Sequence, residues 1–393
     1  KILMLCIYIR KVLETHLNYL PQTDRDCYTT KRILSAGLAY SKSFKTLFNA
    51  SIILKIRKNF QNNLNSLPFD KINLSDTFNS CIYGTDFERL VTNAITMGIT
   101  SQLKIGLRNK SITNNLSTQL LNRQNQLATL YVLRQISTTS NEQANQSERA
   151  KEMRRVHLST LGYIDCLSSP VSHKVGINKQ LSIFATVLLA TTSELIIDKI
   201  EKNDNLIPLS KIEDNLSLIY SENLWYVYVN GNLIGFVKDG IHFTTIFRNK
   251  RRNMELHSYY ITIYYKELTR EVHFWCDMGR VTRPLLIVYN NKRDPEFFTK
   301  KEQAQPFMQK ILLTDEHING LLNNDISIEY LVKEKIIEYI TPGEQLNCHI
   351  AYRYNKLLEN QNKIKKEYTH CDIPQSICGL PALTSPAASH NDI

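Results

Sequence analysis

The chain has 393 residues, 42% of them hydrophobic, which is long enough for two to four domains with cores of their own. No apolar run approaches the ~20 residues that span a bilayer, and the eight cysteines form no C-x-x-C pair, so a membrane protein and a zinc ribbon are disfavoured. The net charge of +11 lies in the first half, where residues 1–190 carry 24 Lys and Arg against 11 Asp and Glu. This asymmetry favours contact with a polyanion, although an AT-rich genome also explains overall basicity.

The first ~110 residues show helical spacing of apolar side chains. Residues 1–17 predict a buried helix rather than a targeting segment, because charged residues interrupt them. A second helical stretch covers 34–60, and the charged run 23–32 between the two predicts a loop. The scattered cysteines fit reduced thiols, so we expect a protein that is not secreted.

A helix is predicted over 116–135, followed by a polar, mobile tip over 136–149 and a return segment. The return segment places Arg154, Arg155 and His157 within four residues, and such cations suit a nucleic-acid backbone or a triphosphate. Arg123 and Arg134 lie eleven residues apart, on one face of the predicted helix. We expect these five residues to contact nucleic acid or nucleotide. The alternative for each is a structural role, in which an arginine covers a core or the histidine bonds to its scaffold.

The second half changes to a two-residue period that predicts strands. Residues 225–237 predict a hairpin with Asn230–Gly231 as its turn, and 259–265 and 272–277 predict a second strand pair. Residues 285–289 predict a buried strand, whereas spacing alone favours a solvated pair for Arg280 and Arg283. Residues 312–340 predict a helix-rich segment, and a metal site at His370, Cys371 and Cys378 is disfavoured against simple packing.

Several motifs follow one another in an order known from a protein family. The first matches lie at Asp24, Asp26, Lys31, Arg32 and Gly37, and the second group at Leu116, Ser117, Leu121, Arg123, Leu130, Arg134, Arg154, His157 and Gly162. Later matches are Asp277-Met-Gly-Arg-Val-Thr-Arg-Pro-Leu285 and Thr369-His-Cys-Asp-Ile373. This series resembles the second-largest subunit of multisubunit DNA-directed RNA polymerases. Its details look most similar to the type found in large nucleocytoplasmic DNA viruses, and we expect the sequence to be an internal fragment.

The resemblance implies an α+β, multidomain fold. It assigns 1–110 to a helical protrusion and lobe part, 111–185 to a fork, 186–300 to a β-rich external 1 domain, 301–360 to external 2, and 361–393 to the start of a hybrid-binding domain. The implied partners are template DNA, nascent RNA, ribonucleoside triphosphates, and the largest and smaller polymerase subunits. The implied cofactor is Mg²⁺, which the largest subunit binds, so this part alone is expected to be inactive. A viral origin implies virion and host cytoplasm, and any other origin implies nucleus or cytoplasm.

One departure from the family pattern keeps an alternative open. Where the family has an acidic turn, this chain has Ser168, Val171 and Ser172. The alternative is a pseudo-subunit that serves only in assembly or nucleic-acid binding.

Overall fold

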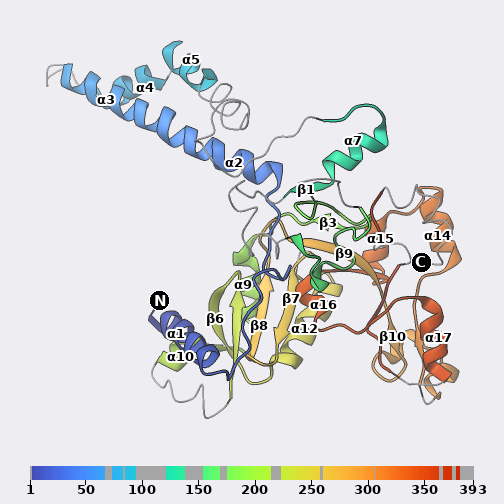
Figure 1. Cartoon of the computed structure of the whole chain (residues 1–393). Coiled ribbons are helices and arrows are strands. Elements are labelled where there is room, and N and C mark those ends of the chain that lie inside the picture. The colour runs from blue at the N-terminus through green and yellow to red at the C-terminus, as the bar shows by residue number, and fades with distance from the viewer. Residues whose placement is uncertain are drawn as a thin grey trace. The chain divides into compact units, whose positions relative to one another are not determined.

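The computed structural model describes two compact units of the chain (Figure 1). The body comprises 1–33, 134–136 and 142–393, and the helical unit comprises 34–133 and 137–141. The described residues within them are 2–66, 73–82, 85–93, 121–137, 154–168, 175–213, 223–256, 260–305, 307–362, 366–373 and 378–380. Helices and sheets are mixed, as expected for an α+β protein.

The helical unit contains a long helical run, as its apolar spacing predicts. Helix α2 (Ala36–Leu47), a π-helical segment (Phe48–Ile53) and α3 (Leu54–Ser66) follow one another without a gap. The run begins at Ser35, whose hydroxyl accepts a hydrogen bond from the Leu38 N–H at 3.4 Å. Helices α4 (Leu74–Ile82) and α5 (Thr85–Asn93) follow, and an edge-to-face contact between Phe60 and Phe78 joins α3 to α4.

The helix predicted over 116–135 is shorter in the structure. Helix α7 spans only Gln126–Leu133, because the Asn125 side chain accepts a hydrogen bond from the Ala128 N–H at 2.6 Å and caps its start. Arg123 therefore precedes the helix and Arg134 follows it, so the prediction that both lie on one helical face is wrong. Residues 116–120 and most of the predicted polar tip, 138–149, lie outside the described residues.

Helix α1 (Ile2–His16) begins the body, and the prediction that it is buried holds for one face only. Ile7 is buried against the first sheet, beside Leu224 and Phe236. The opposite side carries Leu5, Ile9, Val12 and Leu13, which are 51–69% exposed. Apolar residues on both sides of a helix do not reveal which side a neighbour covers, and this is why the prediction fails.

The first sheet has five strands in the order β4-β6-β5-β8-β7. Its hairpins match the prediction: Asn230 and Gly231 have φ of 49° and 82°, as a tight turn between two strands requires. All neighbours are antiparallel except β5 and β8. The strands are β4 (Ile207–Pro208), β5 (Trp225–Val229), β6 (Asn232–Val237), β7 (Thr262–Lys266) and β8 (Glu271–Trp275).

Both faces of this sheet are covered, because side chains alternate along β5. Val227 and Val229 pack with α9 (Ser193–Glu201) and α12 (Gly240–Arg252), which supply Ile196, Ile200, Phe243 and Phe247. Tyr226 and Tyr228 point to the other face, where α1 lies (Figure 1).

The second sheet is built around β9 (Val281–Ile287), which is buried along its whole length. The strand predicted over 285–289 is buried as expected, but it divides between the end of β9 and the next strand, which begins at Tyr289. Its neighbours are β3 (Thr186–Val187), β12 (Ile337–Ile340) and β14 (His370–Cys371), and β13 (Ile350–Ala351) pairs with β14. Two short pairs are β1 (Gln135–Ser137) with β2 (Asn178–Gln180) and β10 (Tyr289–Asn290) with β11 (Gln309–Lys310).

Short helices complete the body: α10 (Leu209–Glu213), α13 (Lys300–Gln303), α14 (Asp315–Leu322), α15 (Ile328–Lys333), α16 (Pro342–Gln345) and α17 (Tyr354–Asn362), with 3₁₀ turns at Leu158–Thr160 and Pro295–Phe297. None of the helices in the described ranges is long and apolar enough to span a bilayer.

Candidate nucleic-acid interface

The imidazole of His157 joins two segments that are far apart in the sequence. Its Nε2 lies 2.7 Å from Asp24 Oδ2, and its Nδ1 accepts a hydrogen bond from the Ser159 N–H at 3.1 Å. An accepting Nδ1 leaves the proton on Nε2, which therefore donates to the carboxylate. The Asp26 N–H and then His157 lower the pKa of Asp24. His157 also precedes the 3₁₀ turn Leu158–Thr160 and caps it.

A second contact completes what we call the His157 junction, formed by Asp24, Tyr28, His157 and Ser159. The Tyr28 N–H donates to Ser159 Oγ at 2.9 Å. Burial raises the pKa of the Tyr28 phenol to about 12. Lys31 and Lys179 place their ammonium groups 5.1 and 5.8 Å from the centre of its ring. The junction therefore gathers two lysines beside the histidine.

The end of the charged run, Arg32–Ile33, docks on the turn after the first sheet. Arg32 Nε donates to Asp277 Oδ2 at 2.6 Å, and its guanidinium lies 4.7 Å from the ring centre of Trp275. The Ile33 N–H donates to the Gly279 carbonyl at 2.7 Å. Gly279 has φ +87°, and a Cβ there would lie 2.4 Å from the Ile33 carbonyl oxygen, so the close approach requires glycine. The run is thus a docked loop, in agreement with the prediction of a loop.

Arg280 and Arg283 are each only 3% exposed, so the solvated pair favoured by spacing is wrong. Arg280 donates to the Tyr260 carbonyl at 2.8 Å and to Thr262 Oγ1 at 2.6 Å. Burial lowers the pKa of Arg280 to about 10. Arg283 donates to Asp372 Oδ2 at 2.6 Å. Both guanidinium groups hold neighbouring segments together instead of facing solvent.

The Arg283 guanidinium fixes the turn that follows the His157 junction. It lies 5.4 Å from the ring centre of Tyr163, whose hydroxyl donates to the Ile340 carbonyl at 3.1 Å. Gly162 has φ +82°, and a Cβ at this position would lie 2.3 Å from Arg283 Nη1. Three of the predicted motifs, at 162, 283 and 372, therefore meet in one buried contact.

The five predicted contact residues have different environments. Arg134 donates to the carbonyls of Ser182, Ile183 and Ala185, all within 3.1 Å, and burial lowers the pKa of its guanidinium. Arg154 donates to the Val175 carbonyl at 2.8 Å. Arg155 is exposed.

The body therefore brings Arg154, Arg155 and His157 together on one segment. It places Arg134 as a clamp on the loop after β2. Arg123 is exposed and belongs to the helical unit.

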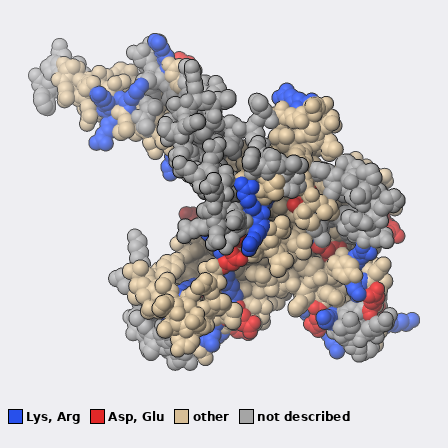
Figure 2. Space-filling model, viewed as in Figure 1, with Lys and Arg blue, Asp and Glu red and all other residues tan. Residues whose placement is uncertain are grey.

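A basic surface on the helical unit was not among the predicted sites. Residues 36–66 contain five Lys or Arg and no Asp or Glu, and this local imbalance is the signal that would have found it. Lys55, Arg57 and Lys58 are exposed on α3. Figure 2 shows Lys and Arg side chains projecting over this helical run.

A buried ionic cluster joins the two sheets of the body. Arg251 on α12 contacts Glu338 at 2.5 Å and also contacts Glu344, while Arg252 contacts Glu338 at 2.7 Å. His370 Nε2 lies 3.1 Å from Glu338 Oε2. Burial alone would raise the pKa of Glu338, but Arg252 and Arg251 hold it well below its usual value. Backbone groups at the start of β7 complete the cluster, because Arg251 also donates to the Ile261 carbonyl and Glu344 accepts from the Ile263 N–H at 2.7 Å.

Within the ranges that the structure describes, no three His, Cys, Asp or Glu side chains gather as a metal site. His370 is bonded to Glu338, and Cys371 and Cys378 are buried free thiols. The described part of the body offers backbone clamps, a docked loop and surface cations.

Two domain models match this chain. Residues 119–187 match RNA polymerase Rpb2 domain 3, and residues 227–289 match RNA polymerase Rpb2 domain 4. These matches support a second-largest RNA polymerase subunit. The first match includes His157 and Ser159 of the His157 junction. The second match begins within β5 and extends through β9.

Similar full-length proteins support the same conclusion. The chain is 26% identical to DNA-directed RNA polymerase subunit Rpo2 of Sulfolobus acidocaldarius over 98% of its length, which covers 30% of that protein. It is 26% identical to DNA-directed RNA polymerase III subunit RPC2 of Saccharomyces cerevisiae over 100% of its length, again 30% of that protein. For DNA-directed RNA polymerase II subunit RPB2 of Schizosaccharomyces pombe the identity is 26%, over 98% of this chain and 32% of the relative. The chain thus spans about a third of the length of these relatives.

Proposed function

We propose that the chain acts in transcription as the part of an RNA polymerase second subunit that holds nucleic acid near the point where the strands separate. The observation that carries this proposal is the His157 junction, which presents Arg155 at the surface of a segment fixed by Asp24 and Ser159. A rigidly held backbone with exposed cations suits phosphate contacts, because these depend on charge and position rather than on base identity.

The five predicted residues take different parts in this proposal. Arg155 and Arg123 are the direct phosphate contacts, since both are exposed. Arg154, Arg134 and His157 position the backbone through the bonds described above. The exposed cations of α3 add a second, sequence-independent contact.

Nucleotidyl transfer needs two metal ions held by carboxylates. We assign the Mg²⁺ ions to the largest subunit, as the resemblance implies. The proposed partners are template DNA, nascent RNA, ribonucleoside triphosphates, and the largest and smaller subunits. A viral origin, with a virion and host-cytoplasm location, remains our proposal from the altered turn at Ser168. The relatives named above are archaeal and eukaryotic.

The pseudo-subunit alternative rests on that same turn. Ser168 is described, but residues 169–174 lie outside the described residues, so the geometry adds nothing in its favour. Retention of nucleic acid without any effect on chain elongation would identify such a subunit.

The test replaces Arg155 by Ala in the reconstituted polymerase and measures retention of a forked DNA at several salt concentrations. One lost phosphate contact should lower the slope of log affinity against log salt by about one. The exposed Lys301→Ala serves as control for a general change in charge. If Arg155→Ala and Lys301→Ala gave the same slope of log affinity against log salt, the proposed phosphate contact of Arg155 would be refuted.

A further inference from the structure

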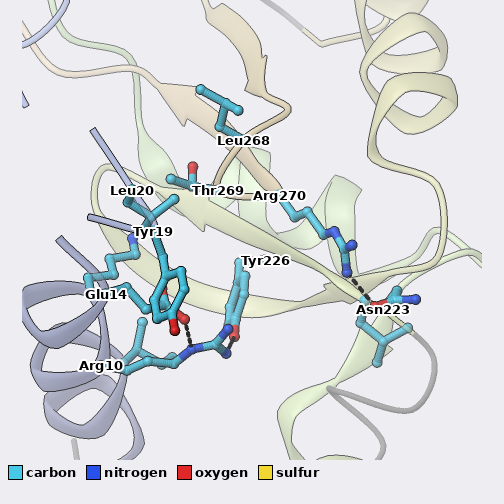
Figure 3. Close-up of a pocket in the computed structure, with 12 residues that line it drawn as sticks. Arg10, Glu14, Tyr19, Leu20, Asn223, Tyr226, Leu268, Thr269 and Arg270 are labelled. Carbon is cyan, nitrogen blue, oxygen red and sulfur yellow. Dashed lines mark hydrogen bonds and ion pairs between the residues drawn. The ribbon is translucent and has the colours of Figure 1, made fainter. Parts of the chain in front are cut away.

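A cavity of about 300 Å³ lies between α1 and one end of the first sheet, and none of its lining residues belongs to the His157 junction (Figure 3). Ile7, Leu20 and Leu224 give it an apolar floor. Charged and polar groups stand around this floor: Arg10, Lys11, Glu14, Asn223 and Arg270.

The cations of the cavity are not equivalent. Arg10 bonds to Glu14 at 2.5 Å, and Lys11 bonds to the buried Glu271, so carboxylates offset both charges. Arg270 instead donates to the neutral amide oxygen of Asn223 at 2.6 Å, as Figure 3 shows. The bond to Asn223 therefore holds the Arg270 guanidinium in place but does not offset its positive charge.

Two large side chains of the lining are strongly exposed. Tyr19 and Leu268 are 78% and 77% exposed and belong to its lining. Large apolar side chains at the rim extend the contact surface beyond the cavity, as is typical of sites that bind another protein.

We propose that this cavity binds a segment of a partner protein that carries an acidic residue next to a bulky apolar one. The apolar side chain fills the floor between Ile7 and Leu224, and the carboxylate pairs with Arg270, for which a guanidinium offers two parallel donors. A nucleotide fits less well, because a phosphate dianion needs several unpaired cations and would face the Glu14 carboxylate. The inference goes beyond the proposed function and does not depend on it.

The test uses fluorescence polarisation with the full chain and a short fluorescein-labelled peptide that alternates Glu with Phe and Leu. We expect saturable binding that Arg270→Glu weakens about tenfold or more, because a like charge replaces the paired one. Leu268→Asp should weaken it as well, through the lost apolar rim. Lys301→Glu makes the same charge change at an exposed position outside the lining and should leave the affinity unchanged.

A second probe separates protein from nucleic acid. The same peptide with Gln in place of Glu should bind about tenfold more weakly. The affinity for a labelled oligothymidylate should be the same in the native chain and in Arg270→Glu. Unchanged peptide affinity in Arg270→Glu, or no saturation in the native chain, would overturn the site. A different result would overturn the choice of ligand: the peptide does not bind, and the oligothymidylate binds the native chain but not Arg270→Glu. Far-ultraviolet circular dichroism confirms that each variant is folded.

Discussion

At the scale of single residues, Gly162 meets two demands at once. Its φ of +82° disfavours any side chain, and its missing Cβ leaves the space that the Arg283 guanidinium occupies. Gly231 has the same φ, but a Cβ there would meet its nearest neighbour, Trp275, only at 3.9 Å. Substitutions at Gly162 and Gly231 therefore distinguish the cost of backbone strain, which both share, from the cost of a steric clash, which only Gly162 has.

We expect Gly162→Ala to lower the free energy of unfolding of the body by about 3 kcal/mol, and Gly231→Ala by only about 1 kcal/mol. The chain has two tryptophans, Trp225 and Trp275, and both lie in the first sheet, so their fluorescence during urea unfolding reports on the body. Equal losses in the two variants would mean that Arg283 moves away without cost.

At the scale of elements, the docking of α1 on β8 depends on a buried carboxylate. Burial acts to raise the pKa of Glu271, but hydrogen bonds from His273 and Lys11 bring it down to about 2. A group whose pKa is depressed in the folded state stabilises above its unfolded value, here near 4.5, and this stabilisation is lost as the pH falls toward 2.

Glu271→Gln should therefore cost about 2–3 kcal/mol at pH 7, and the difference from the native chain should shrink toward zero near pH 2. Urea unfolding followed by tryptophan fluorescence across this pH range measures the effect. Glu267 is exposed on the neighbouring turn, so Glu267→Gln should not change how the free energy of unfolding falls between pH 7 and pH 2. A constant difference between pH 7 and pH 2 for Glu271→Gln would contradict the depressed pKa.

The elements that the sequence predicted well are those fixed by local interactions. The Asn230–Gly231 hairpin follows from two residues that tolerate positive φ, and both adopt it. The prediction of a solvated Arg283 fails because its partner, Asp372, lies 89 residues away and only the tertiary fold brings it near. In the same way, the sequence indicates His157 as a candidate, but spacing does not reveal its bond to Asp24, 133 residues earlier.

At the scale of the whole molecule, Glu338 is the residue on which the two sheets of the body depend. It pairs with Arg251 and Arg252 from α12 and with His370 from β14, and its side chain is 6% exposed. Removing its charge leaves guanidinium groups buried without a full partner, which is far more costly than the loss of a surface pair.

Glu338→Gln should destabilise the body by about 3–5 kcal/mol in urea unfolding. Asp198→Asn breaks the exposed pair with Lys202 on α9 and should cost no more than about 0.5 kcal/mol. Limited proteolysis of the Glu338→Gln variant should cut between the sheets before it cuts within them. A loss as small as that of the Asp198 control would show that solvent reaches the cluster.

The distance along the chain within this cluster has a consequence during protein synthesis. Arg251 leaves the ribosome 87 residues before Glu338. At about 5–20 residues per second this interval lasts about 4–17 s. Until then the guanidinium groups of Arg251 and Arg252 lack the Glu338 carboxylate, and burying them without it would be costly. The ionic cluster between the two sheets is therefore completed only after translation has passed the codon for Glu338, and in a nascent chain stalled before that point both guanidinium groups lack this partner.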